Sequence, residues 1–159
     1  MDKLYKYGLT KLFLIIALEV VKKYGISTKY SHLDSSSLHL HGKYDKCLNN
    51  LEKDLGINRE HPIMITQGYS RDHRPDLKQC ILDLIVSSDG DIPLFFRGAS
   101  GNESDKAVFA HILVEYSKQI DFESIMVADS ALYSENNLKL MSTMKWISRV
   151  PLSIKKAKN

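Results

Sequence analysis

Ile125-Met126-Val127-Ala128-Asp129-Ser130 is the segment from which the architecture of the chain is best predicted. Its four apolar residues form a short continuous run, which is typical of a strand buried in the centre of a sheet. The run ends on an aspartate, and a carboxylate at the end of a buried strand is costly unless it is paired, hydrogen-bonded or bound to a metal ion. Asp129 is therefore either a functional carboxylate or the cap of the helix that follows.

The segments on either side of this strand are predicted to be helices. Before it, Ser104 and Asp105 offer an N-cap and a first-turn acid to a helix. The apolar residues that share one face of that helix are Val108, Phe109, Ile112, Leu113 and Tyr116. After the strand, a helix is expected at about 135–144 and a last strand at 146–150, so the pattern indicates an α/β protein.

The first half of the chain predicts a helix, a strand and a hairpin. Apolar residues at helical spacing, ended by Gly25, predict a helix packed on something larger. They are Leu12, Phe13, Ile16, Val20, Val21 and Tyr24. Within 29–42, Leu38 and Leu40 alternate with histidines, as in a strand with one buried face. A long connection, 43–76, with a candidate short strand at 63–66, leads to the hairpin.

The hairpin is predicted from two β-rich stretches, 77–88 and 92–97, around the turn-forming cluster Ser-Asp-Gly-Asp. The predicted order of elements is thus helix, strand, long connection, hairpin, helix, strand, helix and strand.

Composition bounds the class of protein. A chain of 159 residues with 43% apolar and 26% charged residues suits one globular domain. The net charge is +3, but no acidic residue follows Glu135, so the C-terminal region is basic and either contacts phosphates or is a solvated end. Two cysteines 33 residues apart fit neither a zinc site nor a disulfide framework. The longest apolar run is too short to span a membrane, so a cytoplasmic protein without a membrane partner is expected.

Asp34 is the second carboxylate that stands out by position, because it lies within the first predicted strand. Should that strand neighbour the one that ends on Asp129, both carboxylates would face one point. Carboxylate oxygens are the ligands that Mg²⁺ prefers, and a pair of such ions can hold the attacking and leaving oxygens of a phosphodiester displacement. For each aspartate alone, a capping or turn role remains the alternative.

Four blocks of the sequence, in order between about residues 9 and 150, resemble one family. They are HLDSSS (32–37), GYSRDHRPDLKQ (68–79), GNESD (101–105) and VADSALY (127–133). Together they are similar to the DDE transposases of bacterial insertion sequences. The resemblance implies a ribonuclease-H-like core, a mixed sheet flanked by helices, in which Asp34 and Asp129 are catalytic residues that jointly bind Mg²⁺ or Mn²⁺ in a two-metal site.

The same resemblance implies a third acidic residue, a glutamate on a helix well past the last strand. No residue after Glu135 can take that part, and Glu135 itself, six residues past Asp129, is given a structural or capping role. The chain is therefore expected to be a partial catalytic domain, truncated at both ends and incomplete at the C-terminus. Its expected parts are a leading helix (1–25), a ribonuclease-H-like core (26–150) and a basic tail (151–159).

The block 68–79 also carries candidate DNA contacts, because its basic groups suit the phosphate backbone. These residues are Arg71, His73, Arg74 and Lys78. In the alternative, the loop pairs its own charges, since Asp72 and Asp76 nearly cancel them. The partners implied are double-stranded DNA, both transposon ends and target DNA, and a second copy of the chain in a homodimer.

The function implied is the cutting and joining of transposon-end DNA. A metal-activated water would attack a phosphodiester at the element's end, and the freed 3′-hydroxyl would then attack target DNA. Two carboxylates without the third are expected to bind metal weakly, so the chain alone is expected to be inactive. The alternatives are a non-catalytic DNA-binding or dimerising remnant, and a standalone ribonuclease-H-like nuclease, for which the sequence lacks acidic residues.

Overall fold

The computed structural model describes residues 2–44, 63–69, 73–120, 123–152 and 154. The chain divides into two compact units. The first unit comprises Met1–Ser35, Asp83–Arg97 and Ser104–Asn159, and the second comprises Ser36–Leu82 and Gly98–Glu103. None of the helices in the described ranges has the length and apolar character needed to cross a membrane.

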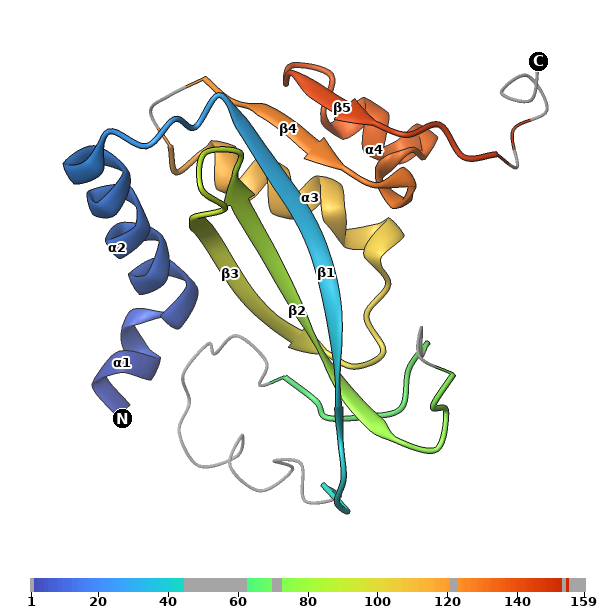
Figure 1. The fold of residues 1–159 in the computed structure, drawn as a ribbon. Helices are drawn as coiled ribbons and strands as arrows, with labels where there is room; N and C mark the ends of the chain where they lie inside the picture. The colour runs from blue at the N-terminus through green and yellow to red at the C-terminus, as the bar shows by residue number, and fades with distance from the viewer. Residues whose placement is uncertain (1, 45–62, 70–72, 121–122, 153, 155–159) are drawn as a thin grey trace. The chain divides into compact units, whose positions relative to one another are not determined.

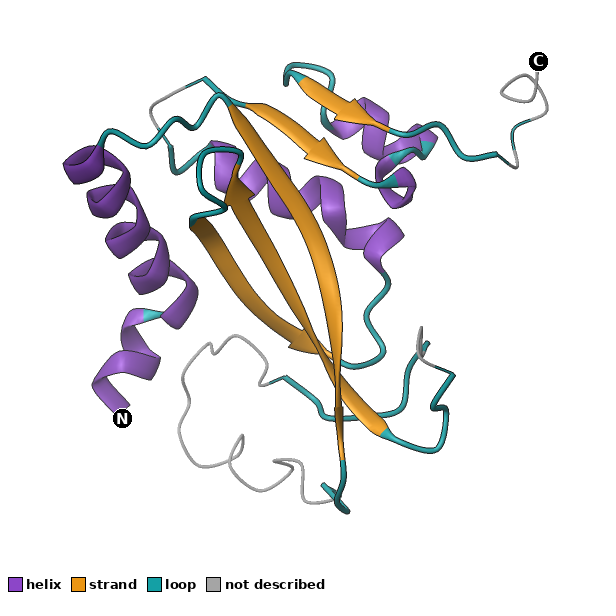
Figure 2. Ribbon diagram, viewed as in Figure 1, coloured by secondary structure: helices purple, strands orange, loops and turns teal. Residues whose placement is uncertain are grey.

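Helices and strands follow one another along the chain in nearly the predicted order (Figures 1 and 2). The elements are α1 (Asp2–Tyr7), α2 (Leu9–Tyr24), β1 (Tyr30–Leu40), β2 (Lys78–Ser87), β3 (Pro93–Ser100), α3 (Asp105–Ser117), β4 (Ile125–Ala128), the 3₁₀ helix η1 (Ser130–Leu132), α4 (Glu135–Leu140) and β5 (Trp146–Ser148). The strand predicted from the run before Asp129 is β4, and the last predicted strand is β5.

The five strands form one mixed sheet in the order β3-β2-β1-β4-β5. β1 pairs with β4 and β4 pairs with β5, both in parallel. β2 and β3 are the predicted hairpin and run in opposite directions (Figure 2), with the Ser87 N–H donating to the Ile92 carbonyl across the turn (2.9 Å). Gly90 and Asp91 have φ of 73° and 52° in this turn, the left-handed region that Gly and Asp tolerate. The expected α/β class, a mixed sheet flanked by helices, is confirmed.

Helices cover both faces of the sheet in the first unit. Successive residues of a strand point to opposite faces, and Phe95 and Phe96 of β3 show which helix lies on each. Phe95 meets Tyr116 of α3 at 6.0 Å between ring centroids, and Phe96 meets Phe13 of α2 at 5.8 Å. α3 therefore packs on one face and α2 on the other.

The apolar face of α3 is the centre of the core, as predicted. Phe109, Leu113 and Tyr116 are completely buried. The other buried members of the same cluster come from the sheet and the remaining helices: Leu14, Leu33, Ile85, Leu94, Phe95, Ala110, Ile112, Met126, Ala128, Leu132 and Met141. Burial raises the pKa of the Tyr116 hydroxyl to about 12, against a smaller opposite effect of Ser31. This tyrosine is therefore neutral throughout the physiological range.

The predicted apolar face of the leading helix is wrong in part. Leu14 and Ala17 are the buried residues of α2, and Leu18 and Val21 pack against the core. Two residues of the predicted face, Ile16 and Tyr24, are exposed. The predicted end of the helix is confirmed, because Gly25 takes a left-handed conformation (φ 63°) and its N–H donates to the Val21 carbonyl.

The buried face of β1 also differs from the prediction. Ser31, Leu33 and Ser35 are buried and alternate with exposed residues. Leu38, which was expected on the buried face, is 46% exposed. The alternation therefore places Asp34 on the face opposite to Leu33 and Ser35.

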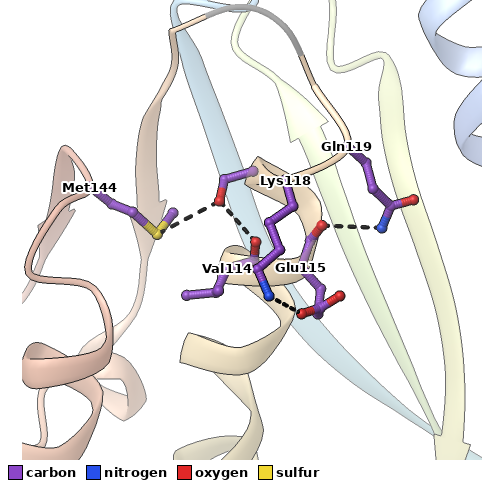
Figure 3. Close-up of polar contacts among 6 residues, drawn as sticks. Val114, Glu115, Lys118, Gln119 and Met144 are labelled. Atoms are coloured by element: carbon purple, nitrogen blue, oxygen red, sulfur yellow. Dashed lines mark hydrogen bonds and ion pairs between the residues drawn. The ribbon is translucent and has the colours of Figure 1, made fainter.

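Side chains form hydrogen bonds with backbone carbonyls at the C-terminal end of α3 (Figure 3). The Ser117 hydroxyl donates to the Val114 carbonyl (2.8 Å) and lies 4.0 Å from the Met144 sulfur. The Gln119 side-chain amide donates to the Glu115 carbonyl (3.1 Å). The Val114 carbonyl also accepts the Lys118 N–H (3.2 Å), and the Gln119 amide binds a carbonyl of the last helical turn, where regular helical donors run out.

Three segments of the second unit, which contain Gly68, Gln79 and Gly101, pack so closely that an added Cβ would overlap backbone atoms. Thr66 and Gln79 exchange two backbone hydrogen bonds (2.8 and 3.2 Å) and form an isolated antiparallel bridge where a short strand was predicted at 63–66. The Gln79 side-chain amide donates to the Gly101 carbonyl (2.7 Å). A Cβ added to Gly101 would lie 2.0 Å from the Gln79 carbonyl oxygen, and one added to Gly68 would lie 1.8 Å from the Gly101 oxygen. Two of the family-like blocks, 68–79 and 101–105, are thus joined by close backbone contact.

Gly101→Ala is expected to lower the free energy of unfolding by about 1–3 kcal/mol, because backbone atoms cannot move aside as a flexible side chain can. Gly98→Ala is the matched control, since its added Cβ would make an ordinary contact of 3.6 Å with Ile63 and should change the free energy by no more than about 0.5 kcal/mol. Urea unfolding measures both. Equal effects of the two substitutions would contradict the close packing at Gly101.

Candidate functional site

The register of β1 and β4 brings the two predicted carboxylates together. Leu33 pairs with Ala128 in this parallel ladder, so Asp34 and Asp129 occupy the next positions of the two chains. Leu33 and Ala128 are both buried, whereas Asp34 and Asp129 are both exposed. Because strand residues alternate between faces, both carboxylates lie on the face opposite to that buried pair.

Asp34 lies in the middle of a long strand. β1 continues six residues beyond it to Leu40, so its backbone is fixed on both sides. The Asp34 carboxylate accepts a hydrogen bond from the Ser35 N–H through Oδ1 (2.9 Å). Within the described residues its other oxygen makes no hydrogen bond and remains open to a cation.

Asp129 is the cap of the short helix that follows β4. Its Oδ1 accepts from the Ala131 N–H (2.8 Å), and its backbone is extended. Its carbonyl oxygen accepts from the Ser148 hydroxyl (2.7 Å), which ties it to the end of β5. The capping role considered from the sequence is therefore present. It occupies one oxygen of the carboxylate and leaves the second, among the residues described, without a hydrogen bond.

Among the residues that the structure describes, this arrangement includes no third ligand. No group of three or more His, Cys, Asp and Glu side chains suited to a metal ion occurs in the described part of the chain. Glu135, in the first turn of α4, forms an ion pair with Lys139 four residues on (2.7 Å), and both side chains are largely exposed. The arrangement can thus offer two carboxylates to a divalent cation.

A third carboxylate, which the analysis of the sequence missed, is buried on the other side of the sheet. Asp83 of β2 is 2% exposed and binds both the Ser35 hydroxyl and the Arg97 guanidinium. The signal for it was a lone acid in the apolar run 80–86. Such a residue at an inward position of a strand must find a partner.

The predicted DNA contacts fall in the second unit, and the structure gives two of them other partners. Arg71 lies outside the described residues. His73 is exposed and has a φ of 55°. Arg74 binds Asp76 through two hydrogen bonds, from Nε (2.9 Å) and from NH2 (2.8 Å), and the Lys78 ammonium donates to the Lys43 carbonyl. Charge pairing within the loop, the alternative considered from the sequence, is therefore present at Arg74.

The Arg74–Asp76 pair changes the titration of both groups. The hydrogen bond from Arg74 is the main cause that lowers the pKa of Asp76 to about 2, and the same pair raises the pKa of Arg74. The folded pKa of Asp76 thus lies below its ordinary value, so the stabilisation that the pair provides is present above about pH 3.8 and is lost as the pH falls through about 2. Because both side chains are exposed, solvent screens the effect on overall stability.

Carboxyl-detected NMR should give Asp76 a titration midpoint near 2. Arg74→Gln removes the guanidinium and is expected to bring the midpoint back toward the ordinary aspartate value of about 3.9. Lys78→Gln is the control and should leave the midpoint in place, because Lys78 does not contribute to the shift of Asp76. An unchanged midpoint in Arg74→Gln would contradict the pairing.

Comparison with known proteins gives similarity at the level of the fold. No protein-family model and no characterised protein matches the sequence. Among solved structures, the chain is similar to the Mos1 transposase paired-end complex with the left transposon end, with a TM-score of 0.45 at 14% identity over 87% of this chain and 40% of that chain. The Mos1 mariner paired-end complex with Mn gives 0.44 at 13%, over 89% and 41%.

The catalytic domain of Mos1 mariner transposase gives a TM-score of 0.43 at 9% identity, over 91% of this chain and 60% of that chain. The chain thus spans about 40% of the transposase chains in the two complexes.

Proposed function

We propose that this chain is part of an enzyme of the DDE transposase kind, which cuts and joins DNA by metal-dependent phosphoryl transfer. The observation that carries the proposal is the β1–β4 register, which puts the exposed residues Asp34 and Asp129 at neighbouring positions, on the face opposite to Leu33 and Ala128. The blocks of sequence that resemble the family contain both aspartates. Neither residue is needed to fill the core, because both are exposed.

The two carboxylates suit a hard divalent cation. Asp34 and Asp129 would each contribute the oxygen that makes no hydrogen bond in the described structure, and neighbouring strands would hold the two oxygens at a fixed spacing. When bound, Mg²⁺ or Mn²⁺ activates water and neutralises charge on the phosphodiester. The hydrogen bonds from Ser35 and Ala131 fix the orientation of the two carboxylates.

The proposal includes DNA and a divalent metal as partners of this chain. The similar structures include complexes described with transposon ends and with Mn, and for this chain both belong to the proposal. We also propose that the chain acts on transposon-end and target DNA, is located in the cytoplasm and forms a homodimer. With two carboxylates in place of three, we propose that the chain is a partial catalytic domain that is inactive alone.

Mn²⁺ titration followed by electron paramagnetic resonance tests the metal centre. Asp34→Asn and Asp129→Asn should each weaken binding by about 10-fold or more, because each removes a charged oxygen ligand. Asp129→Asn is informative, since an asparagine oxygen still accepts from the Ala131 N–H and keeps the cap. Asp91→Asn is the control, because it removes an exposed aspartate from the β2–β3 turn. Mn²⁺ affinity that is equal in all four proteins would refute a metal role for the pair.

A DNA assay separates the proposal from a standalone nuclease. The purified chain, residues 1–159, is expected not to nick transposon-end DNA with Mg²⁺, because two carboxylates provide too few ligands for a two-metal reaction. Nicking that disappears in Asp34→Ala would show that the chain is active alone.

The second candidate function is a non-catalytic DNA-binding or dimerising remnant. It is favoured by the cap that Asp129 provides to η1, which gives this aspartate a structural reason to be present. In that case Asp34→Ala leaves DNA binding unchanged, whereas removing Arg71 and Arg74 lowers the slope of log affinity against log salt by about 0.9 for each lost phosphate contact.

A further inference from the structure

We propose that Ser35, Asp83 and Arg97 form a clamp that fixes the part of β1 carrying Asp34, and that Ser35 and Asp83 are positioning residues of the candidate metal centre. This inference rests on the proposed function. It assigns a role to the buried carboxylate of Asp83, which the metal centre itself does not use.

The three clamp residues come from three neighbouring strands. The Ser35 hydroxyl donates to Oδ1 of Asp83, and Nη1 of Arg97 lies 2.8 Å from Oδ2. Ser35 and Asp83 are paired by the ladder, because the Ser88 N–H donates to the Tyr30 carbonyl and β1 and β2 run in opposite directions (Figure 2), so that a shift of five residues along each strand leads to Ser35 and Asp83. The clamp therefore joins side chains of β1, β2 and β3.

The clamp is shielded from water. Ser35 is 4% exposed and Asp83 is 2% exposed, and the residues two positions away on the same face of β2, Ile81 and Ile85, are buried and apolar. A carboxylate in such a place is destabilising unless its oxygens are bound. Loss of the hydrogen bond to either oxygen of Asp83 would therefore be destabilising. Water does not compete with Asp83 for the Ser35 hydroxyl.

The clamp acts on Asp34 through the backbone. Ser35 follows Asp34 directly and is held from the core side of the sheet, while Asp34 points to the other face. The Ser35 N–H, whose position the clamp fixes, is the donor that binds the Asp34 carboxylate. Fixing Ser35 thus fixes both the main chain and the carboxylate orientation of Asp34. Asp129 is positioned separately by Ala131 and Ser148.

Three substitutions test whether the clamp positions the site or only stabilises the sheet. Ser35→Ala removes the hydroxyl and leaves the Asp83–Arg97 pair intact, and it is expected to weaken Mn²⁺ binding by about 10-fold, as loss of a residue that orients a ligand does. Ser35→Thr retains a hydroxyl and should restore the affinity. Ser31→Ala is the matched control, because Ser31 is equally buried on the same face of β1 but binds Ser124 (2.8 Å).

The readouts are Mn²⁺ affinity, melting temperature, and amide hydrogen exchange at Asp34 and Ser35 without metal. Ser35→Ala should speed exchange at these two amides by about 10-fold, and Ser31→Ala should not. A lower melting temperature with unchanged Mn²⁺ affinity, or unchanged exchange, would overturn the positioning role. Should the unmodified chain bind no Mn²⁺ through Asp34 and Asp129, the proposed function fails; faster exchange in Ser35→Ala then marks the clamp as purely structural.

Discussion

The parallel pairing of β4 with β1 connects the two parts of the sheet. β4 has only four residues, yet it links β1 on one side to β5 on the other and places Ala128 beside Leu33 in the core. A strand with neighbours on both sides and helices over the sheet must be apolar along its whole length. Asp129, which follows β4 directly, is exposed and need not be apolar. It lies at the level of Asp34 in β1.

The elements of the fold could be predicted where the sequence pattern had one interpretation. The run 125–128, the α3 face around Phe109 and the turn at Gly90 are such patterns, and each forms the predicted element. The buried face of α2 could not be predicted, because apolar residues occur on several of its faces and only contact with the sheet selects Leu14 and Ala17. The buried face of β1 was missed because two of its inward residues are serines, which pattern analysis counts as polar.

The candidate site was predictable in its residues and not in its geometry. Sequence spacing places Asp34 and Asp129 on two strands, but strands whose paired residues are 95 positions apart along the chain can pair in many registers, and only tertiary packing selects one. Asp83 was missed for a different reason. The free-energy cost of burying its carboxylate is compensated by hydrogen bonds from Ser35 and Arg97, which lie on two other strands. Such long-range partners leave no local pattern in the sequence.

Because Asp129 caps η1, its carboxylate would take part both in cation binding and in formation of the turn. The carboxylate that would bind a cation also accepts the N–H that begins the turn Ser130–Leu132. If a bound cation changes the free energy of the capped turn, the cap changes the free energy of cation binding by the same amount and in the same direction, because coupling between two sites is reciprocal. Binding of a cation to the two carboxylates would therefore change the stability of the segment that connects β4 to α4, without any movement of the sheet.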